Sequence, residues 1–274
     1  MTGLDTVIFG GTVVTASDTF DADVGIKDGK IALIGKDLPD AAERIDATGH
    51  YLLPGGIDSH VHIAQPGEPG VVMADDFESA TRSAICGGHT TVLPFCLQAK
   101  GQSLHDAVRW YHGLADGNCY TDISFHIILT DPTPQVLGQE LPALVADGYT
   151  SIKVFMTYEG MKLSDREILD TLEGAKASGA LCMVHAENDD MIEYLRDRAA
   201  DKGDTAPKFH ATTRPVPAER EATHRAIALA EIVDVPIVIV HVSNGDAMDE
   251  IRAGRRRGSR VFGAAGAFAW PSLP

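Results

Sequence analysis

Short apolar runs alternate with amphipathic stretches along most of the chain, from Tyr51 onwards. A short apolar run is typical of a strand buried on both faces, and an intervening stretch of helical period is typical of a crossover helix. The alternation therefore predicts an α/β fold in which helices cover a parallel sheet. The predicted strands are 56–60, 90–93, 123–129, 151–155, 181–185 and 236–241.

Two of the predicted helices have recognisable ends. Ser164 and Glu167 form the pattern of a capping box, apolar residues then recur with helical period, and Gly179 is a stop signal. A second helix is predicted over 75–86, before Gly87. Each helix follows a predicted strand, as the units of a barrel do.

The first 53 residues differ from this pattern. Their β-rich runs, such as 6–9, 12–15 and 30–34, are separated by the turn signals Gly10-Gly11 and Asp28-Gly29. This segment predicts a small β unit, which we interpret as the N-terminal part of a β-sandwich. The chain is thus expected to contain two parts, residues 1–53 and a larger (β/α) barrel from residue 54.

The predicted barrel is incomplete. A TIM-like (β/α)8 barrel needs eight strand and helix units, and the sequence offers six clear strands and a weak seventh at 260–263. The barrel part is therefore assigned to 54–263. Residues 264–274 are rich in small residues and proline, and we interpret them as a tail.

Composition excludes several classes of partner. Asp and Glu number 39 against 23 Lys and Arg, a formal charge of -16, so the chain lacks the basic surface that binds nucleic acid. No run approaches the length of a membrane span, and residues 1–10 lack a basic stretch followed by a long apolar run, so we expect no signal peptide. We expect a cytoplasmic protein without disulfides, since the four cysteines form no CxxC pair, and with Cys182 buried in its strand.

The strongest local signal for chemistry is His60-Val61-His62, at the end of the first barrel strand. Residues two apart in a strand project to the same side, so both imidazoles can bind one metal ion. A solvated or hydrogen-bonded histidine pair is the alternative interpretation.

Other candidate ligands also fall at strand ends. His185 ends one predicted strand, His241 ends the next, and Lys153 lies inside an apolar strand. The carboxyl ends of barrel strands converge on one site. Burial disfavours the charged ammonium, and a neutral amine can react with carbon dioxide to give a carbamate that bridges two cations. A lysine that reaches solvent or pairs with a carboxylate is the alternative.

Four runs together resemble the hydantoinase and dihydropyrimidinase family of the cyclic amidohydrolases. They occur in the family's order and cover most of the chain: Pro54-Gly55-Gly56-Ile57-Asp58-Ser59-His60-Val61-His62, Ser151-Ile152-Lys153-Val154-Phe155-Met156-Thr157-Tyr158, Val184-His185-Ala186-Glu187-Asn188 and Val240-His241-Val242-Ser243.

The resemblance implies a metal-dependent hydrolase that opens the ring of a dihydropyrimidine or a hydantoin. His60 and His62 would hold one divalent ion, most commonly Zn²⁺, His185 and His241 a second, and carboxylated Lys153 would bridge them. A hydroxide shared by the ions would attack the ring carbonyl. Tyr158 would bind the substrate and donate a hydrogen bond to the oxyanion; a surface aromatic is the alternative.

The sequence also departs from the family. The family's aspartate at the end of strand eight and its later substrate loops have no counterpart, and the match ends near Gly263. We therefore interpret the chain as C-terminally truncated, and its own activity is open. Allantoinase- or dihydroorotase-like hydrolysis, an inactive chain and a non-enzymatic scaffold are the rival hypotheses. Family resemblance also implies a homodimer or homotetramer.

Overall fold

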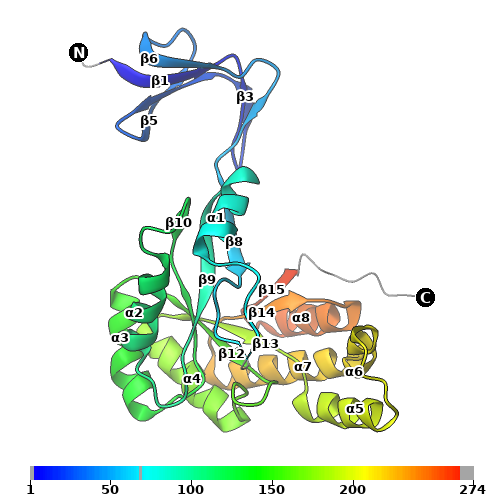
Figure 1. Ribbon diagram of the computed structural model, residues 1–274. Helices are drawn as coiled ribbons and strands as arrows, with labels where there is room; N and C mark the ends of the chain where they lie inside the picture. The colour runs from blue at the N-terminus through cyan, green and yellow to red at the C-terminus, as the bar shows by residue number, and fades with distance from the viewer. Residues whose placement is uncertain (1–2, 68–69, 266–274) are drawn as a thin grey trace. The chain divides into compact units, whose positions relative to one another are not determined.

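The computed structural model describes residues 3–67 and 70–265, which form two compact units (Figure 1). Of the described residues, one unit comprises 3–57 with 88–90, and the other comprises 58–67, 70–87 and 91–265. The boundary passes through strand β8 (Gly56–Val61), close to the change of pattern seen in the sequence.

The N-terminal unit is built from two small sheets. One has the strand order β5-β4-β1-β6 and the other the order β3-β2-β7. Asp28 and Gly29 both have positive φ, so they form the tight turn between β4 and β5 that their sequence predicts. The strands are β1 (Leu4–Phe9), β2 (Thr12–Val14), β3 (Thr19–Asp21), β4 (Asp23–Lys27), β5 (Lys30–Gly35), β6 (Ala41–Asp46) and β7 (Tyr51–Leu52).

The larger unit alternates strands and helices, as the sequence predicts. Its strands after β8 are β9 (His89–Leu97), β10 (Asp122–Ile123), β11 (His126–Ile128), β12 (Ser151–Phe155), β13 (Leu181–His185), β14 (Ile237–Val242) and β15 (Val261–Ala265). Its helices are α1 (Phe77–Cys86), α2 (Leu104–Ala115), the π-helix η1 (Val136–Glu140), α3 (Leu141–Ala146), α4 (Asp165–Ser178), α5 (Asp189–Asp201), the 3₁₀ helix η2 (Pro207–Phe209), α6 (His210–Thr213), α7 (Val216–Val233) and α8 (Gly245–Arg257).

The strands form one sheet, parallel from β9 to β15, with the order β10-β9-β11-β12-β13-β14-β15 and with β8 also paired to β9. β10 and β11 keep the same register on β9, since Asp122 lies opposite Thr91 and His126 opposite Phe95. They are thus one interrupted strand, as predicted for 123–129. The predicted fold, an incomplete barrel with a small N-terminal β portion, is confirmed.

The weak seventh strand is also present. It is β15, which pairs in parallel with β14 and includes the first two residues of the segment interpreted as a tail. The rest of that segment, 266–274, lies outside the described residues.

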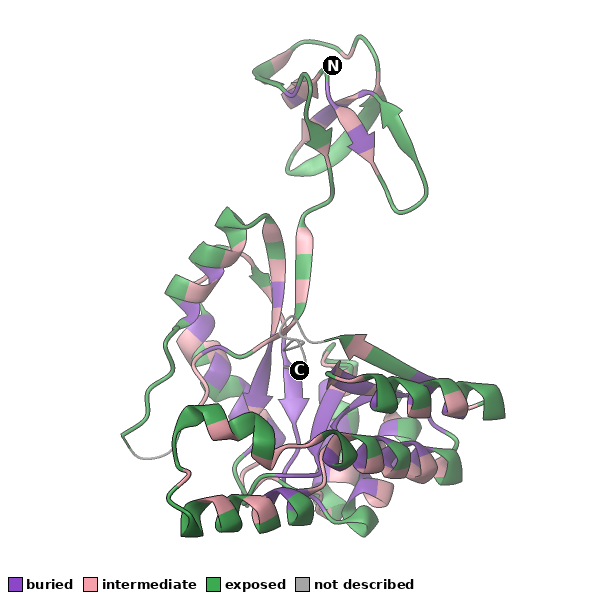
Figure 2. Ribbon diagram, turned by 90° about the vertical axis from the view of Figure 1, so that its right-hand side faces the viewer, coloured by how far each residue is buried: buried purple, intermediate pink, exposed green. Residues whose placement is uncertain are grey.

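Two layers of apolar side chains lie on opposite faces of the sheet. Ile152 and Val154 pack toward the helices, with Cys182, which is fully buried as predicted. Phe155 belongs to a smaller inner cluster. Figure 2 shows the buried strands lying inside the surrounding helices. This alternation places every second side chain of a strand inside the barrel, where a site can form.

Helix α4 begins and ends as the sequence predicts. The Ser164 side chain accepts a hydrogen bond from the Glu167 backbone amide, and the Glu167 carboxylate accepts one from the Ser164 backbone amide. Gly179, which follows the helix, adopts the left-handed conformation. Helix α1 likewise has a capping box, from Asp76 to Ser79, and is followed by Gly87. Both predicted helices are confirmed, and α1 begins two residues later than the predicted 75.

Ser164→Ala is expected to lower the free energy of unfolding by about 1 kcal/mol, because it removes the acceptor at the start of α4. Ser178→Ala is the matched control. The Ser178 hydroxyl donates to the carbonyl of Gly174 one turn back, a bond that does not cap the helix, so its loss should change stability little. Urea denaturation of the two variants measures the difference, and equal stabilities would contradict the role of the cap.

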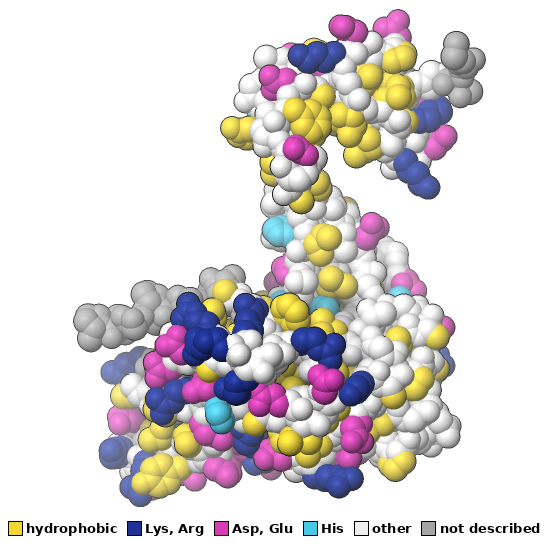
Figure 3. Space-filling view, turned by 180° about the vertical axis from the view of Figure 1, so that it is seen from behind, with side chains coloured by type: hydrophobic (Ala, Val, Ile, Leu, Met, Phe, Trp, Pro, Cys, Tyr) yellow, Lys and Arg dark blue, Asp and Glu magenta, His cyan; other side chains and the backbone are white. Residues whose placement is uncertain are grey.

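The described surface carries mixed charge. Figure 3 shows Lys and Arg side chains interspersed with Asp and Glu over the visible face of the larger unit. None of the described helices is long and apolar enough to cross a membrane.

Candidate active site

Four histidines predicted as metal ligands lie together at the ends of the barrel strands. The ring centroids of His60 and His62 are 5.6 Å apart, those of His60 and His241 5.3 Å, and those of His241 and His185 4.5 Å. Because Val61 and Ile63 pack toward the helices, His60 and His62 alternate onto the inner face. The four imidazoles thus form one cluster at the ends of β8, β13 and β14.

Lys153 lies beside this cluster, on the inner face of β12. It is 1% exposed, and its Nζ lies 3.4 Å from His60 Nε2. The rings of Phe95 and Phe155 lie 4.2 and 4.9 Å from Nζ, and none of the described carboxylates forms an ion pair with it. Desolvation lowers the pKa of Lys153 to about 7. A substantial fraction of the amine is therefore neutral near neutral pH.

A break in strand register brings His241 into the cluster. In β14, Ile237 and Ile239 face the helices, whereas Val238 and Val240 face the inner cluster. Continued alternation would turn His241 toward the helices. Instead the register shifts between Ile239 and Val242, and His241 adopts a φ of 40°. Irregularities of this kind re-aim side chains beside active sites.

The donor set fits a divalent metal ion. Desolvation lowers the pKa of His60 and of His241 to about 3, so both imidazoles are neutral, the form that binds a metal. Among residues 3–67 and 70–265, no three His, Cys, Asp or Glu side chains form a metal site by themselves. A metal ion held by two of these imidazoles would therefore need further ligands.

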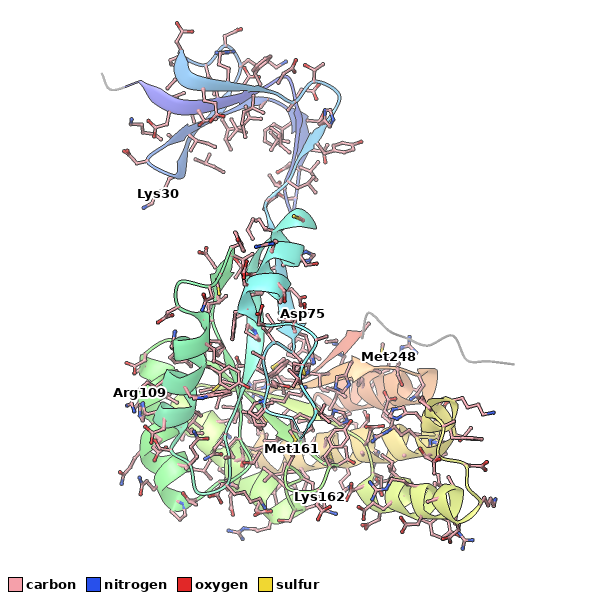
Figure 4. All side chains as sticks on the ribbon, in the orientation of Figure 1. Lys30, Asp75, Arg109, Met161, Lys162 and Met248 are labelled. Atoms are coloured by element: carbon pink, nitrogen blue, oxygen red, sulfur yellow. The ribbon has the colours of Figure 1, made fainter. Side chains whose placement is uncertain are left out.

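Tyr158 lines the same cavity. The cavity measures about 780 Å³, and its walls include His62, Lys153, His185 and His241. The Tyr158 ring lies 5.1 Å from that of His185, and its side chain is accessible from the cavity. Met161, labelled in Figure 4, lies on the segment after β12 and also lines the cavity.

The remaining histidines lie outside this cluster. His126 is buried, its ring lies 5.1 Å from Phe95, and its nitrogens bond to the Ser151 hydroxyl and the Ser59 carbonyl. Its contacts are those of a packing residue.

Glu187 and Arg214 belong to the site but carry no role in the sequence interpretation. A Glu187 oxygen lies 2.6 Å from His185 Nε2 and accepts from Arg214 at 2.7 Å. Burial alone would raise the pKa of Glu187, but His185 and Arg214 lower it to about 2. The ionised carboxylate accepts only, so His185 Nε2 carries the proton and Nδ1 is free to bind a metal. In the sequence, the only indication of this contact is that an acidic residue, Glu187, lies two positions after His185.

Comparison with known proteins identifies the family. A model of the amidohydrolase family matches residues 51–213, which is more than half of the chain. The chain belongs to that family. The match includes His60, His62, Lys153 and His185, and His241 lies beyond it.

The similar proteins include hydantoinases and dihydropyrimidinases. The D-hydantoinase of Ralstonia pickettii is 48% identical over 94% of this chain and 56% of its own length, and the dihydropyrimidinase of Dictyostelium discoideum is 38% identical over 94% and 52%. The crystal structure of dihydropyrimidinase from Brevibacillus agri is 45% identical, with a TM-score of 0.93 over 97% of this chain and 58% of that one. The chain spans about half the length of the relatives that it matches.

Proposed function

We propose that the chain provides the metal-binding part of a hydrolase that opens cyclic amides, such as hydantoins or 5,6-dihydropyrimidines. The observation that carries the proposal is the cluster of His60, His62, His185 and His241 around Lys153. The names of the similar proteins, hydantoinase and dihydropyrimidinase, support the substrate class.

The protein groups would act by position and charge. A cyclic amide in the cavity would place its carbonyl between the histidine cluster and Tyr158, which lie on its walls. The Tyr158 hydroxyl would donate to the carbonyl oxygen as negative charge develops on it. The apolar side chains of Leu97, Phe155 and Met161 would contact the rest of the ring and keep water away.

Two divalent ions, Zn²⁺ by preference, would complete the site. His60 and His62 would hold one, His185 and His241 the other, and Lys153 carboxylated on Nζ would bridge them. The metal ions would lower the pKa of a bound water and polarise the ring carbonyl. The chemistry of imidazole and carbamate oxygen suits zinc, and it also suits manganese and cobalt.

Metal content and ring opening, measured on the same preparation, test this proposal. About two metal ions per chain, with hydrolysis of hydantoin or dihydrouracil that stops when the metal is removed, is the expected result. Metal without turnover would favour a chain that keeps the site but lacks the reaction. Neither metal nor turnover would favour the non-enzymatic scaffold, and hydrolysis of allantoin or dihydroorotate alone would favour the rival substrate class.

Glu187→Gln is expected to weaken metal binding about 10- to 100-fold, because the His185 tautomer is then no longer fixed by a charged acceptor. Competition with a chromogenic chelator measures the affinity without any turnover. Glu173→Gln, a change of the same kind on the exposed face of α4, is the control and should bind metal as the parent does. Unchanged affinity in Glu187→Gln would mean that the carboxylate does not orient His185.

A cytoplasmic location and assembly as a homodimer or homotetramer remain predictions from the sequence. Size-exclusion chromatography with light scattering tests the second of these directly. The small cyclic amide is the proposed partner of the site.

A further inference from the structure

We infer that Asp189 is a positioning residue that fixes the turn presenting Tyr158 to the active-site cavity, an inference that rests on the proposed function of Tyr158. Asp189 is the first residue of α5, which follows β13, whereas Tyr158 follows β12. One carboxylate thus links the ends of two neighbouring strands.

The Asp189 carboxylate accepts three hydrogen bonds from one short segment. Oδ1 accepts from the Thr157 hydroxyl at 2.8 Å and from the Tyr158 backbone amide at 3.2 Å, and Oδ2 accepts from Lys162 Nζ. Lys162, labelled in Figure 4, closes the same turn, because its backbone amide donates to the Tyr158 carbonyl at 2.9 Å. The carboxylate therefore binds the segment before, at and after Tyr158.

Tyr158 needs such support because its backbone is strained. Its φ of 75° lies in the left-handed region, which a tyrosine rarely adopts. A residue held there persists only where its surroundings determine the conformation, and such residues gather at active sites. Thr157 and Asp189 are 1% and 8% exposed, so their bond is sheltered from water. The three hydrogen bonds to Asp189 hold the segment in a backbone conformation that a tyrosine does not favour by itself.

An acidic residue at the start of a helix has a simpler use, since it interacts favourably with the helix dipole. Asp190, the next residue, occupies the same first turn but is exposed, and the hydrogen bonds described for the Tyr158 turn go to Asp189 and not to Asp190. Asp190→Asn removes the same charge from the same helix terminus. It is therefore a matched control for Asp189→Asn.

Amide hydrogen exchange tests the contact without requiring turnover. In Asp189→Asn the Tyr158 amide should exchange about tenfold faster than in the parent, because a charged acceptor becomes a weaker neutral one. Asp190→Asn should leave that rate unchanged. Thr157→Val, which removes one bond and keeps the carboxylate, should accelerate the same amide if Asp189→Asn cannot be purified folded. An unchanged Tyr158 rate in both folded variants would overturn the inference.

A double-mutant cycle on ring opening separates positioning from general stabilisation. Asp189→Asn should lower kcat about tenfold at nearly unchanged KM, and should have little further effect in a Tyr158→Phe background, because it acts through the tyrosine hydroxyl. Equal losses in both backgrounds would overturn the inference. If Tyr158→Phe alone keeps full kcat, the proposed role of Tyr158 fails, while hydrogen exchange still decides the link between Asp189 and the turn.

Discussion

Lys153→Met is expected to lower metal content from about two ions per chain to fewer than one, and to reduce ring opening on the order of a thousandfold or more. The lysine is the group that would join the two histidine pairs, and its Nζ lies 3.4 Å from His60 Nε2. Methionine is unbranched and only one atom shorter than lysine, but it cannot form a carbamate. Elemental analysis and the ring-opening assay measure the two effects.

The same substitution should leave the metal-free fold intact. Lys153 is 1% exposed and its Nζ contacts the rings of Phe95 and Phe155, so the native environment favours an apolar side chain. Burial of an amine is costly, and methionine avoids that cost. Thermal unfolding of metal-free Lys153→Met should therefore occur at or above the parent temperature. A lower temperature would mean that the lysine has a structural role.

Lys100→Met is the control, because Lys100 is exposed in the loop after β9 and does not line the cavity. It should bind metal and turn over substrate as the parent does. If Lys153→Met also keeps both metal ions, the bridging carbamate is wrong, and the histidines alone hold the metal.

Much of this site could be predicted because its residues follow regular strand geometry. His60 and His62 alternate with Val61 and Ile63, so a period of two is enough to put both imidazoles on one face. Lys153 stands out as a charged residue in an apolar strand, and its burial follows from the strand pattern. The parallel order of the strands then brings distant positions to one end of the barrel.

The sequence predicts His241 at a strand end, but strict alternation would turn its side chain toward the helices. The register shift and the positive φ that bring it inside depend on how β14 pairs with β15. Such an irregularity leaves no periodic signal in the strand's own sequence. The prediction therefore rested on the resemblance to a family as much as on geometry.

The residues that support the site could not be predicted from the sequence, for a different reason. Arg214 bonds to Glu187 from the segment between α6 and α7, which has no period to extrapolate. Asp189 resembles an ordinary acidic residue at a helix start, and only the fold brings it to the Tyr158 turn. Sequence patterns predict which strand ends meet, and tertiary packing decides which side chains support them.

Tyr158→Phe is expected to lower kcat about 10²- to 10³-fold while KM changes little, because the lost hydrogen bond forms mainly to the charge that develops in the transition state. The ring remains, so its packing against His185 and the stacking of Arg214 over it, at 5.1 Å from the ring centroid, are retained. Metal content should stay that of the parent. The metal content therefore distinguishes the two variants, because Lys153→Met is expected to lose metal and turnover together.

Tyr194→Phe is the control, since Tyr194 is an exposed tyrosine on α5 that does not line the active-site cavity. Steady-state kinetics of the two variants on hydantoin and dihydrouracil gives the comparison. A rise in KM at constant kcat would mean that Tyr158 binds substrate and transition state equally, and the oxyanion role would then be wrong. A loss of kcat confined to Tyr158→Phe, with metal content unchanged, would place the developing negative charge on the side of the cavity that Tyr158 lines.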